Sequence, residues 1–177
     1  MRIYHLKDVL YFSRKKSLPI TIDGNDIGYV RKTTSDNLEK SSTFSYTSID
    51  EQDDFILGIK NNGWKRFVLA EYQLVTESNR YEFKDKAGNN LFYFCVVGNM
   101  EGHDILIEEN WSGDLEVKLN KVKVAKIKVG EFSLKTTFQF DDTIEENSPL
   151  FALTILMYFM FQIYEDEAEV IENLLDV

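Results

Sequence analysis

The 177-residue sequence predicts a mainly β protein: a closed or nearly closed antiparallel β-barrel of about a dozen strands around a central hydrophobic C-terminal helix. Two observations lead to this fold. Short apolar stretches of period two recur at roughly 8–12-residue spacing, separated by Gly, Asn and Asp, which is typical of all-β proteins. The chain then changes character at 150–164, a segment with no charge that must be enclosed. A barrel threaded by that helix encloses it.

The strands are predicted from strict alternation of apolar and polar residues, which marks a half-buried strand. The clearest cases are 20–22, 81–83, 105–107 and 115–119. Turn residues that tolerate left-handed backbone conformations lie between the strands. They occur at 23–25, 87–90 and 112–114.

Two segments are harder to assign. The segment 64–76, WKRFVLAEYQLVT, fits a strand or one face of a helix, and we favour a strand. The segment 33–54 is rich in Ser, Thr and Asp and has few large apolar side chains. We therefore expect 33–54 to be a long polar loop between strands.

The helix has a clear beginning. Ser148 is suited to the N-cap position and Pro149 to the first helical position. The 16 residues 149–164 would extend for about 24 Å, whereas a bilayer core needs about 30 Å. Acidic residues flank the segment on both sides, and no Lys or Arg is there to orient it in a membrane. These features favour a helix buried in protein over a transmembrane span.

A repeated hairpin unit, in which an apolar strand ending in Asp is followed by a Gly and a second strand, resembles the tubby C-terminal-like superfamily. That superfamily includes the plant LURP-one-related proteins, the phospholipid scramblases and small bacterial members. The hairpins that carry the resemblance are ITIDGNDIGYVRK at 20–32, YEFKDKAGNNLFYFCV at 81–96 and DLEVKLNKVKVAKIKV at 114–129. Residues 124–127 resemble the family's late strand, 132–140 its final strand and 149–164 its central helix.

The resemblance covers nearly the whole chain and implies one tubby-like domain over residues 1–177, with an acidic C-terminal extension at 165–177. It also implies a binding module, because some members of the superfamily bind membrane phosphoinositides. Other members have no settled function. No residue here matches a phosphoinositide-binding motif one by one, so no site residue follows from the resemblance.

Charge is distributed very unevenly. The net charge is −10, and residues 139–177 hold ten acidic and no basic side chains. Such a chain is a poor partner for nucleic acid. The first 16 residues have no apolar run typical of a signal peptide, and there is one cysteine. We expect a cytoplasmic protein with a reduced thiol, at most peripheral to a membrane and without a transmembrane span.

The strongest candidate binding feature is a row of lysines near the end of the barrel, here called the lysine stripe. It consists of Lys118, Lys121, Lys123, Lys126 and Lys128. Lys121 and Lys123 are expected to share one face, as are Lys126 and Lys128, with a register break at Ala125. Each lysine near an anionic membrane contributes about 1 kcal/mol. The alternative is a solvated outer face that discourages edge pairing.

Other candidate residues are interpreted as structural. The basic cluster 14–16 is a soluble turn, and Cys95 lies in an apolar strand. The acidic residues at 141–146 lack the spacing of a calcium loop and favour helix capping. Four further residues are interpreted as structural or rim residues: His5, His103, Trp64 and Trp111. We expect no metal, no cofactor and no enzymatic activity.

The leading functional hypothesis is a non-enzymatic tubby-like binding module that is peripheral at an anionic membrane lipid surface. The alternative is a protein-interaction or assembly module that uses the acidic tail 165–177 and the segment 33–54. In the tail, Ile171, Leu174 and Leu175 follow helical spacing. That apolar row would dock either on the barrel rim or on a partner.

Overall fold

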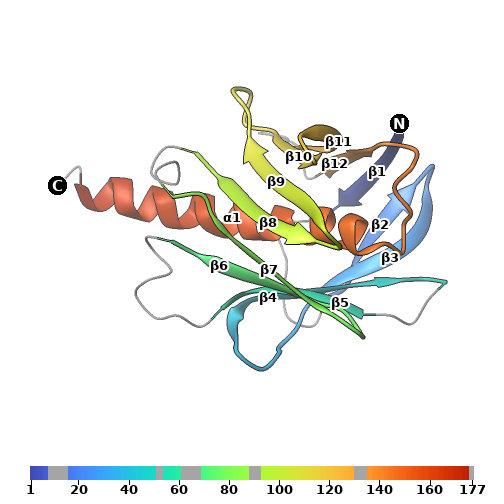
Figure 1. Ribbon diagram of the computed structural model, residues 1–177, viewed down its shortest axis with the longest axis horizontal. Coiled ribbons are helices and arrows are strands. Elements are labelled where there is room, and N and C mark those ends of the chain that lie inside the picture. Colours follow the sequence, from blue (N-terminus) through green and yellow to red (C-terminus); the bar gives the residue numbers. More distant parts are fainter. Residues whose placement is uncertain (8–15, 51–53, 61–68, 88–92, 130–134, 176–177) are drawn as a thin grey trace.

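A computed structural model describes residues 1–7, 16–50, 54–60, 69–87, 93–129 and 135–175, with side chains as far as residue 169. Twelve strands in this part of the chain form one closed antiparallel barrel, and a single helix follows (Figure 1). The first six strands are β1 (Arg2–Lys7), β2 (Leu18–Ile22), β3 (Asn25–Lys32), β4 (Leu38–Ser48), β5 (Asp54–Lys60) and β6 (Glu71–Val75). The others are β7 (Arg80–Asp85), β8 (Cys95–Met100), β9 (His103–Glu109), β10 (Leu115–Leu119), β11 (Val122–Lys128) and β12 (Lys135–Phe140).

The barrel closes between its first and last strands. Every strand pairs with its neighbour in sequence, and β1 pairs with both β2 and β12. The β1–β12 register places Arg2 opposite Phe140 and Lys7 opposite Lys135. Closure gives each of the described strands two partners, so none of these twelve strands is an edge strand that could pair with another chain. The predicted fold class is confirmed.

Three hairpins turn through two residues, at 23–24, 101–102 and 120–121. All six of these residues have positive φ, between 49° and 84°. Positive φ at both central positions defines the type I′ turn, whose twist matches the twist of paired strands. Two of the predicted hairpin units, 20–32 and 114–129, are thus confirmed, whereas part of the third lies outside the described residues.

The predicted loop at 33–54 is wrong, because 11 of its residues form β4. The polar composition concealed an alternation in which Phe44 and Tyr46 point into the barrel. The ring of Phe44 stacks on Phe159 of the helix at 4.8 Å between centroids, and Tyr46 lies 5.6 Å from Phe151. Inward aromatic side chains on one face are enough to hold a strand whose other face is polar.

The ambiguous segment 64–76 contains a strand, as favoured, within the residues that the structure describes. Residues 71–75 form β6, in which Tyr72 and Leu74 are buried. Residues 64–68 lie outside the described part of the chain. The predicted final strand at 132–140 is β12 from residue 135 onward.

The helix α1 (Pro149–Leu175) runs through the barrel and projects beyond the strands at its C-terminal end (Figure 1). Its N-terminus is capped as predicted, since the backbone N–H of Phe151 donates to Oγ of Ser148 at 3.2 Å. Every side chain from 150 to 161 is buried. The expected burial of the uncharged segment 150–164 is therefore confirmed as far as residue 161, whereas Ile163 is only partly buried. Among the described residues, no helix is long and apolar enough to cross a membrane.

The two ends of the barrel are bordered by different segments of the chain. We call the end where α1 leaves the exit end, which is bordered by 33–37 and 110–114. The ring of Phe94 marks it, at 5.4 Å from the rings of both Phe161 and Tyr164. We call the opposite end the entry end, which is bordered by the three type I′ turns and by the link 141–148.

Candidate binding surface on strands β8 to β11

The lysine stripe lies on the outer face of β10 and β11, with one exception. Lys118 belongs to β10, and Lys123, Lys126 and Lys128 belong to β11. Lys121 lies in the 120–121 turn with φ 71°, so it does not share a strand face with Lys123. The stripe thus spans the whole length of the hairpin, with Lys121 at the entry end.

A β-bulge sets the direction of these side chains. Val117 pairs with Ala125 and Lys118 pairs with Lys123, which leaves Val124 as the extra residue. Val124 and Ala125 are consequently both buried. The expected register break is confirmed at this place, and the bulge keeps the lysines on either side of it facing outward.

Carboxylates on the same outer face partly neutralise the stripe. Nζ of Lys118 lies 2.6 Å from Glu108 and 3.8 Å from Glu116, and the hydrogen bond to Glu108 raises the pKa of Lys118. Nζ of Lys126 lies 2.7 Å from Asp114. Nζ of Lys123 lies 3.5 Å from Glu116. Only two stripe lysines, Lys121 and Lys128, have no ion pair with another described residue.

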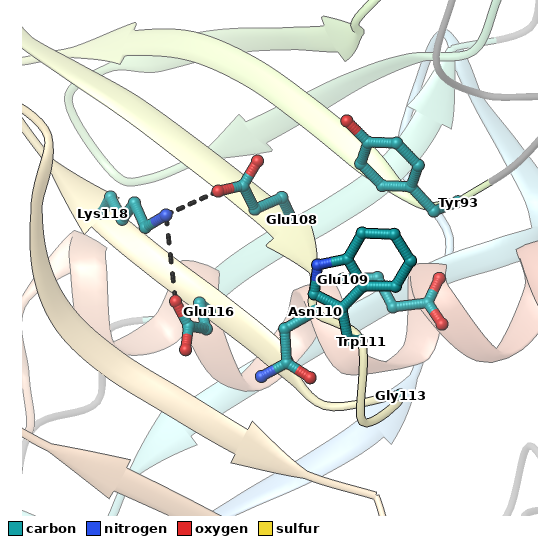
Figure 2. A pocket seen from close by; sticks show the side chains of 8 residues that line it. All are labelled: Tyr93, Glu108, Glu109, Asn110, Trp111, Gly113, Glu116 and Lys118. Atoms are coloured by element: carbon teal, nitrogen blue, oxygen red, sulfur yellow. Dashed lines mark hydrogen bonds and ion pairs between the residues drawn. The ribbon is translucent and has the colours of Figure 1, made fainter.

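A pocket of about 740 Å³ opens on this surface near the exit end (Figure 2). Its described lining includes Tyr93, Glu108, Glu109, Trp111, Glu116 and Lys118. Figure 2 shows the two aromatic rings at one side and the ion pairs of Lys118 at the other. The volume is within the range of about 300–1,000 Å³ that is common for ligand sites.

Trp111 is fully exposed, which corrects the expectation that it packs on the barrel rim. Hydrogen bonds within the loop that carries it define a tight turn. Oδ1 of Asn110 accepts from the backbone N–H groups of Ser112 at 2.8 Å and Asp114 at 3.2 Å, and Gly113 has a positive φ of 73°. A tight turn thus presents the indole to solvent, where a large apolar ring is a common anchor for a partner. Trp64, the other tryptophan, lies outside the described residues.

Negative charge accumulates at the exit end beside the pocket. Oε2 of Glu109 accepts a hydrogen bond from the backbone N–H of Phe94 at 3.2 Å, and Glu109 also faces Glu165 of α1. Partial desolvation, Glu109 and Asp166 together raise the pKa of Glu165. Nearby like charges disfavour the ionised form of a carboxyl group, so Glu165 lies in a locally negative environment. In the described part of the chain, no basic group forms an ion pair with Glu109, Glu165 or Asp166.

The structure also shows the surroundings of several other candidate residues. Cys95 is buried, and Nδ1 of His103 lies 2.8 Å from Nδ2 of Asn120. Asp141 caps the link before α1: its Oδ1 accepts from the backbone N–H and the hydroxyl of Thr143, which lowers its pKa. No group of three or more potential metal ligands occurs within the described ranges. Residues 14 and 15 of the basic cluster lie outside them.

No protein-family model, curated protein or solved structure matches this chain. The class of protein is therefore described from the fold of this chain alone. It is a closed twelve-strand antiparallel barrel with a C-terminal helix packed against the strands. Its surface carries an open pocket with a free tryptophan beside the place where the helix leaves.

Proposed function

We propose that the protein is a non-enzymatic binding module of tubby-like type whose exit end takes a basic segment of a protein partner. A barrel threaded by its C-terminal helix is consistent with that superfamily. The observation that carries the proposal is the uncompensated negative charge at the exit end, where Glu109, Glu165 and Asp166 have no described ion-pair partner. Complementary charge steers association and selects partners.

The chemistry of the pocket supports binding rather than catalysis. A catalytic lysine needs a lowered pKa, so that its amine is free at neutral pH. Lys118 has the opposite shift, because its ammonium is bonded to Glu108. Glu108 and Glu116 in turn both contact that ammonium. The raised pKa keeps Lys118 in its charged form, which suits recognition rather than catalysis.

The geometry favours a protein partner over an anionic membrane at this end. Three stripe lysines are already paired with carboxylates, and α1 carries acidic side chains out through the same end. An anionic surface would approach these carboxylates and be repelled.

A second candidate, binding of anionic lipid, is favoured only at the entry end. There Val122 is 66% exposed and lies between Lys121 and Lys123. An exposed apolar side chain between two lysines suits shallow contact with an anionic lipid surface. This hairpin lies at the opposite end of the barrel from the acidic part of α1 and would work independently of it.

The experiment uses the full chain and two probes. A fluorescein-labelled octalysine peptide is titrated by fluorescence anisotropy at low and physiological salt, and vesicles of phosphatidylcholine with or without about 30% phosphatidylserine are tested by co-sedimentation. We expect saturable peptide binding that weakens with salt, and no co-sedimentation with either vesicle.

Charge variants locate the binding. Asp166→Asn with Glu169→Gln should weaken peptide binding, whereas the control pair Asp50→Asn with Glu77→Gln, at exposed positions of the entry end, should leave it unchanged. Failure to bind the peptide would overturn the proposal. Co-sedimentation only with the anionic vesicles, lost in Lys121→Glu, would establish the second candidate instead.

A further inference from the structure

We propose that the pocket between Tyr93, Trp111 and Glu109 is a subsite for one arginine side chain of the basic partner. This inference rests on the proposed function, because it names the group that the exit end recognises. The aromatic side would take the flat face of the guanidinium, and the carboxylates would take its N–H donors. No residue motif pointed to this site, because its groups come from three separate stretches of the sequence.

The aromatic side provides an exposed stacking surface on the indole of Trp111. Trp111 is fully exposed, and Tyr93 lines the same pocket. In Figure 2 both rings lie at the side of the pocket away from Lys118. An indole is the best aromatic partner for a cation, and arginine stacks on it more often than lysine does.

The charged side provides an excess of acceptors. The described lining has three carboxylates, of Glu108, Glu109 and Glu116, and one ammonium, of Lys118. Lys118 is within ion-pair distance of Glu108 and Glu116, while Glu109 contacts neither that ammonium nor another described cation and has one oxygen bonded to the Phe94 N–H. The second oxygen of Glu109 is the natural first acceptor for an incoming cation.

Arginine fits this combination better than the alternatives. A lysine ammonium is a compact, strongly hydrated charge that stacks poorly, whereas guanidinium is planar, weakly hydrated and always charged. A neutral sugar could stack on Trp111 but would gain nothing from the net negative lining. A second copy of this chain would bring its own acidic helix to the same end, and like charges would oppose that contact.

The test compares acetylated tetra-arginine amide with tetralysine amide, both fluorescently labelled, by anisotropy on the full chain. We expect tetra-arginine to bind more tightly. Trp111→Ala should weaken tetra-arginine binding by about threefold to tenfold, the range of a cation–π contact, and Trp111→Phe should retain part of it. Glu109→Gln should weaken binding similarly, because the amide keeps the acceptor for Phe94 but loses the charge.

Lys118→Met gives a prediction of opposite sign. It removes the ammonium that occupies Glu108 and Glu116, so binding of tetra-arginine should become tighter than in the unaltered chain. The matched controls are Val122→Ala, an exposed apolar truncation at the entry end, and Glu77→Gln, an exposed charge removal there; neither should change affinity.

The outcomes separate the two proposals. If tetra-arginine binds but Trp111→Ala and Glu109→Gln leave its affinity unchanged, the subsite is wrong and the proposed function stands. If neither peptide binds the unaltered chain, the proposed function fails as well. If a neutral oligosaccharide binds and loses affinity in Trp111→Ala while the peptides do not bind, the pocket is a carbohydrate site and both proposals are wrong.

Discussion

At the scale of single residues, two glycines leave room for aromatic rings inside the barrel. A Cβ on Gly28 would lie 2.6 Å from Cε2 of Tyr46, and a Cβ on Gly98 would meet the ring of Phe83 and lie 2.7 Å from the backbone O of Glu82. Both glycines are directly paired in the sheet, Gly98 with Phe83 itself. The absence of a side chain lets the ring fold down over the strand.

Gly98→Ala should therefore destabilise the protein by about 1–3 kcal/mol, as overpacking of a core usually does. The free energy of unfolding in urea measures the loss. The same change in a Phe83→Leu background should cost less, because the ring that the new methyl group meets is gone. Equal losses in both backgrounds would show that the ring is not the cause.

Glu165 should make stability depend on pH in an unusual direction for a carboxylate. In the folded state, desolvation and the charges of Glu109 and Asp166 raise the pKa of Glu165 above the ordinary glutamate value of 4.5. The folded state therefore binds the proton more tightly, so ionisation of Glu165 lowers the free energy of unfolding as pH rises through the folded pKa. Acidification through that range restores the lost stability.

Glu165→Gln should accordingly stabilise the chain at pH 7, and the difference from the unaltered chain should vanish well below pH 4.5. The amide keeps an acceptor for the Nε2 donor of Gln162, which lies 2.9 Å from Glu165 Oε2. Urea unfolding at pH 7 and pH 3.5 measures both values. Lower stability of the variant at pH 7 would contradict the assigned repulsion, and Glu77→Gln is the control.

At the scale of elements, the helix was the most predictable part of the fold. A Ser-Pro pair followed by an uncharged apolar run is typical of a capped, buried helix. The structure agrees, because Ser148 caps the helix and the side chains from 150 to 161 are buried. The sequence predicts a helix over 149–164, and α1 in fact continues to Leu175. Side chains beyond 169, including the apolar row at 171–175, are not among those described.

Leu156→Asp tests the role of the helix as the core of the barrel. Leu156 is completely buried, and an unpaired carboxylate there would cost more than the marginal stability of a domain allows. We expect no folded protein by circular dichroism. Ala168→Asp introduces the same group on the same helix outside the barrel and should fold normally. A cooperatively folded Leu156→Asp variant would rule out the enclosed helix.

The strands were predictable where apolar and polar residues alternate strictly. The features that the sequence did not predict were missed for physical reasons. The sequence does not reveal β4, because its inward Phe44 and Tyr46 lie among Ser and Thr residues and this polar composition suggests a loop. The pocket could not be predicted, because pairing in space brings Tyr93, Glu109 and Lys118 together from separate stretches. The sequence shows the lysines, but which carboxylates lie beside them is determined by the strand register.

At the scale of the whole molecule, ion pairs and hydrogen bonds join the beginning of β1 to the link 141–148 that follows the last strand. The Met1 ammonium lies 2.7 Å from a carboxylate oxygen of Asp142, 141 residues away in sequence. Nη2 of Arg2 donates to the backbone O of Asp142 at 3.2 Å and also to the O of Ile144, and the Tyr4 hydroxyl donates to Glu146 at 2.8 Å. The first strand thus holds the link that leads into the helix.

This connectivity predicts that barrel and helix fold as one unit. The barrel cannot close with an empty interior, and the helix cannot remain stable in water without the barrel, because it is apolar on every face. Thermal unfolding followed by far-ultraviolet and near-ultraviolet circular dichroism should therefore give coincident transitions.

Refolding should take milliseconds to seconds, because the closing contacts are distant in sequence. Hydrogen exchange should show equal protection for slow amides of β1, β12 and α1; a β1–β12 seam that opens at lower free energy than α1 would contradict a single unit.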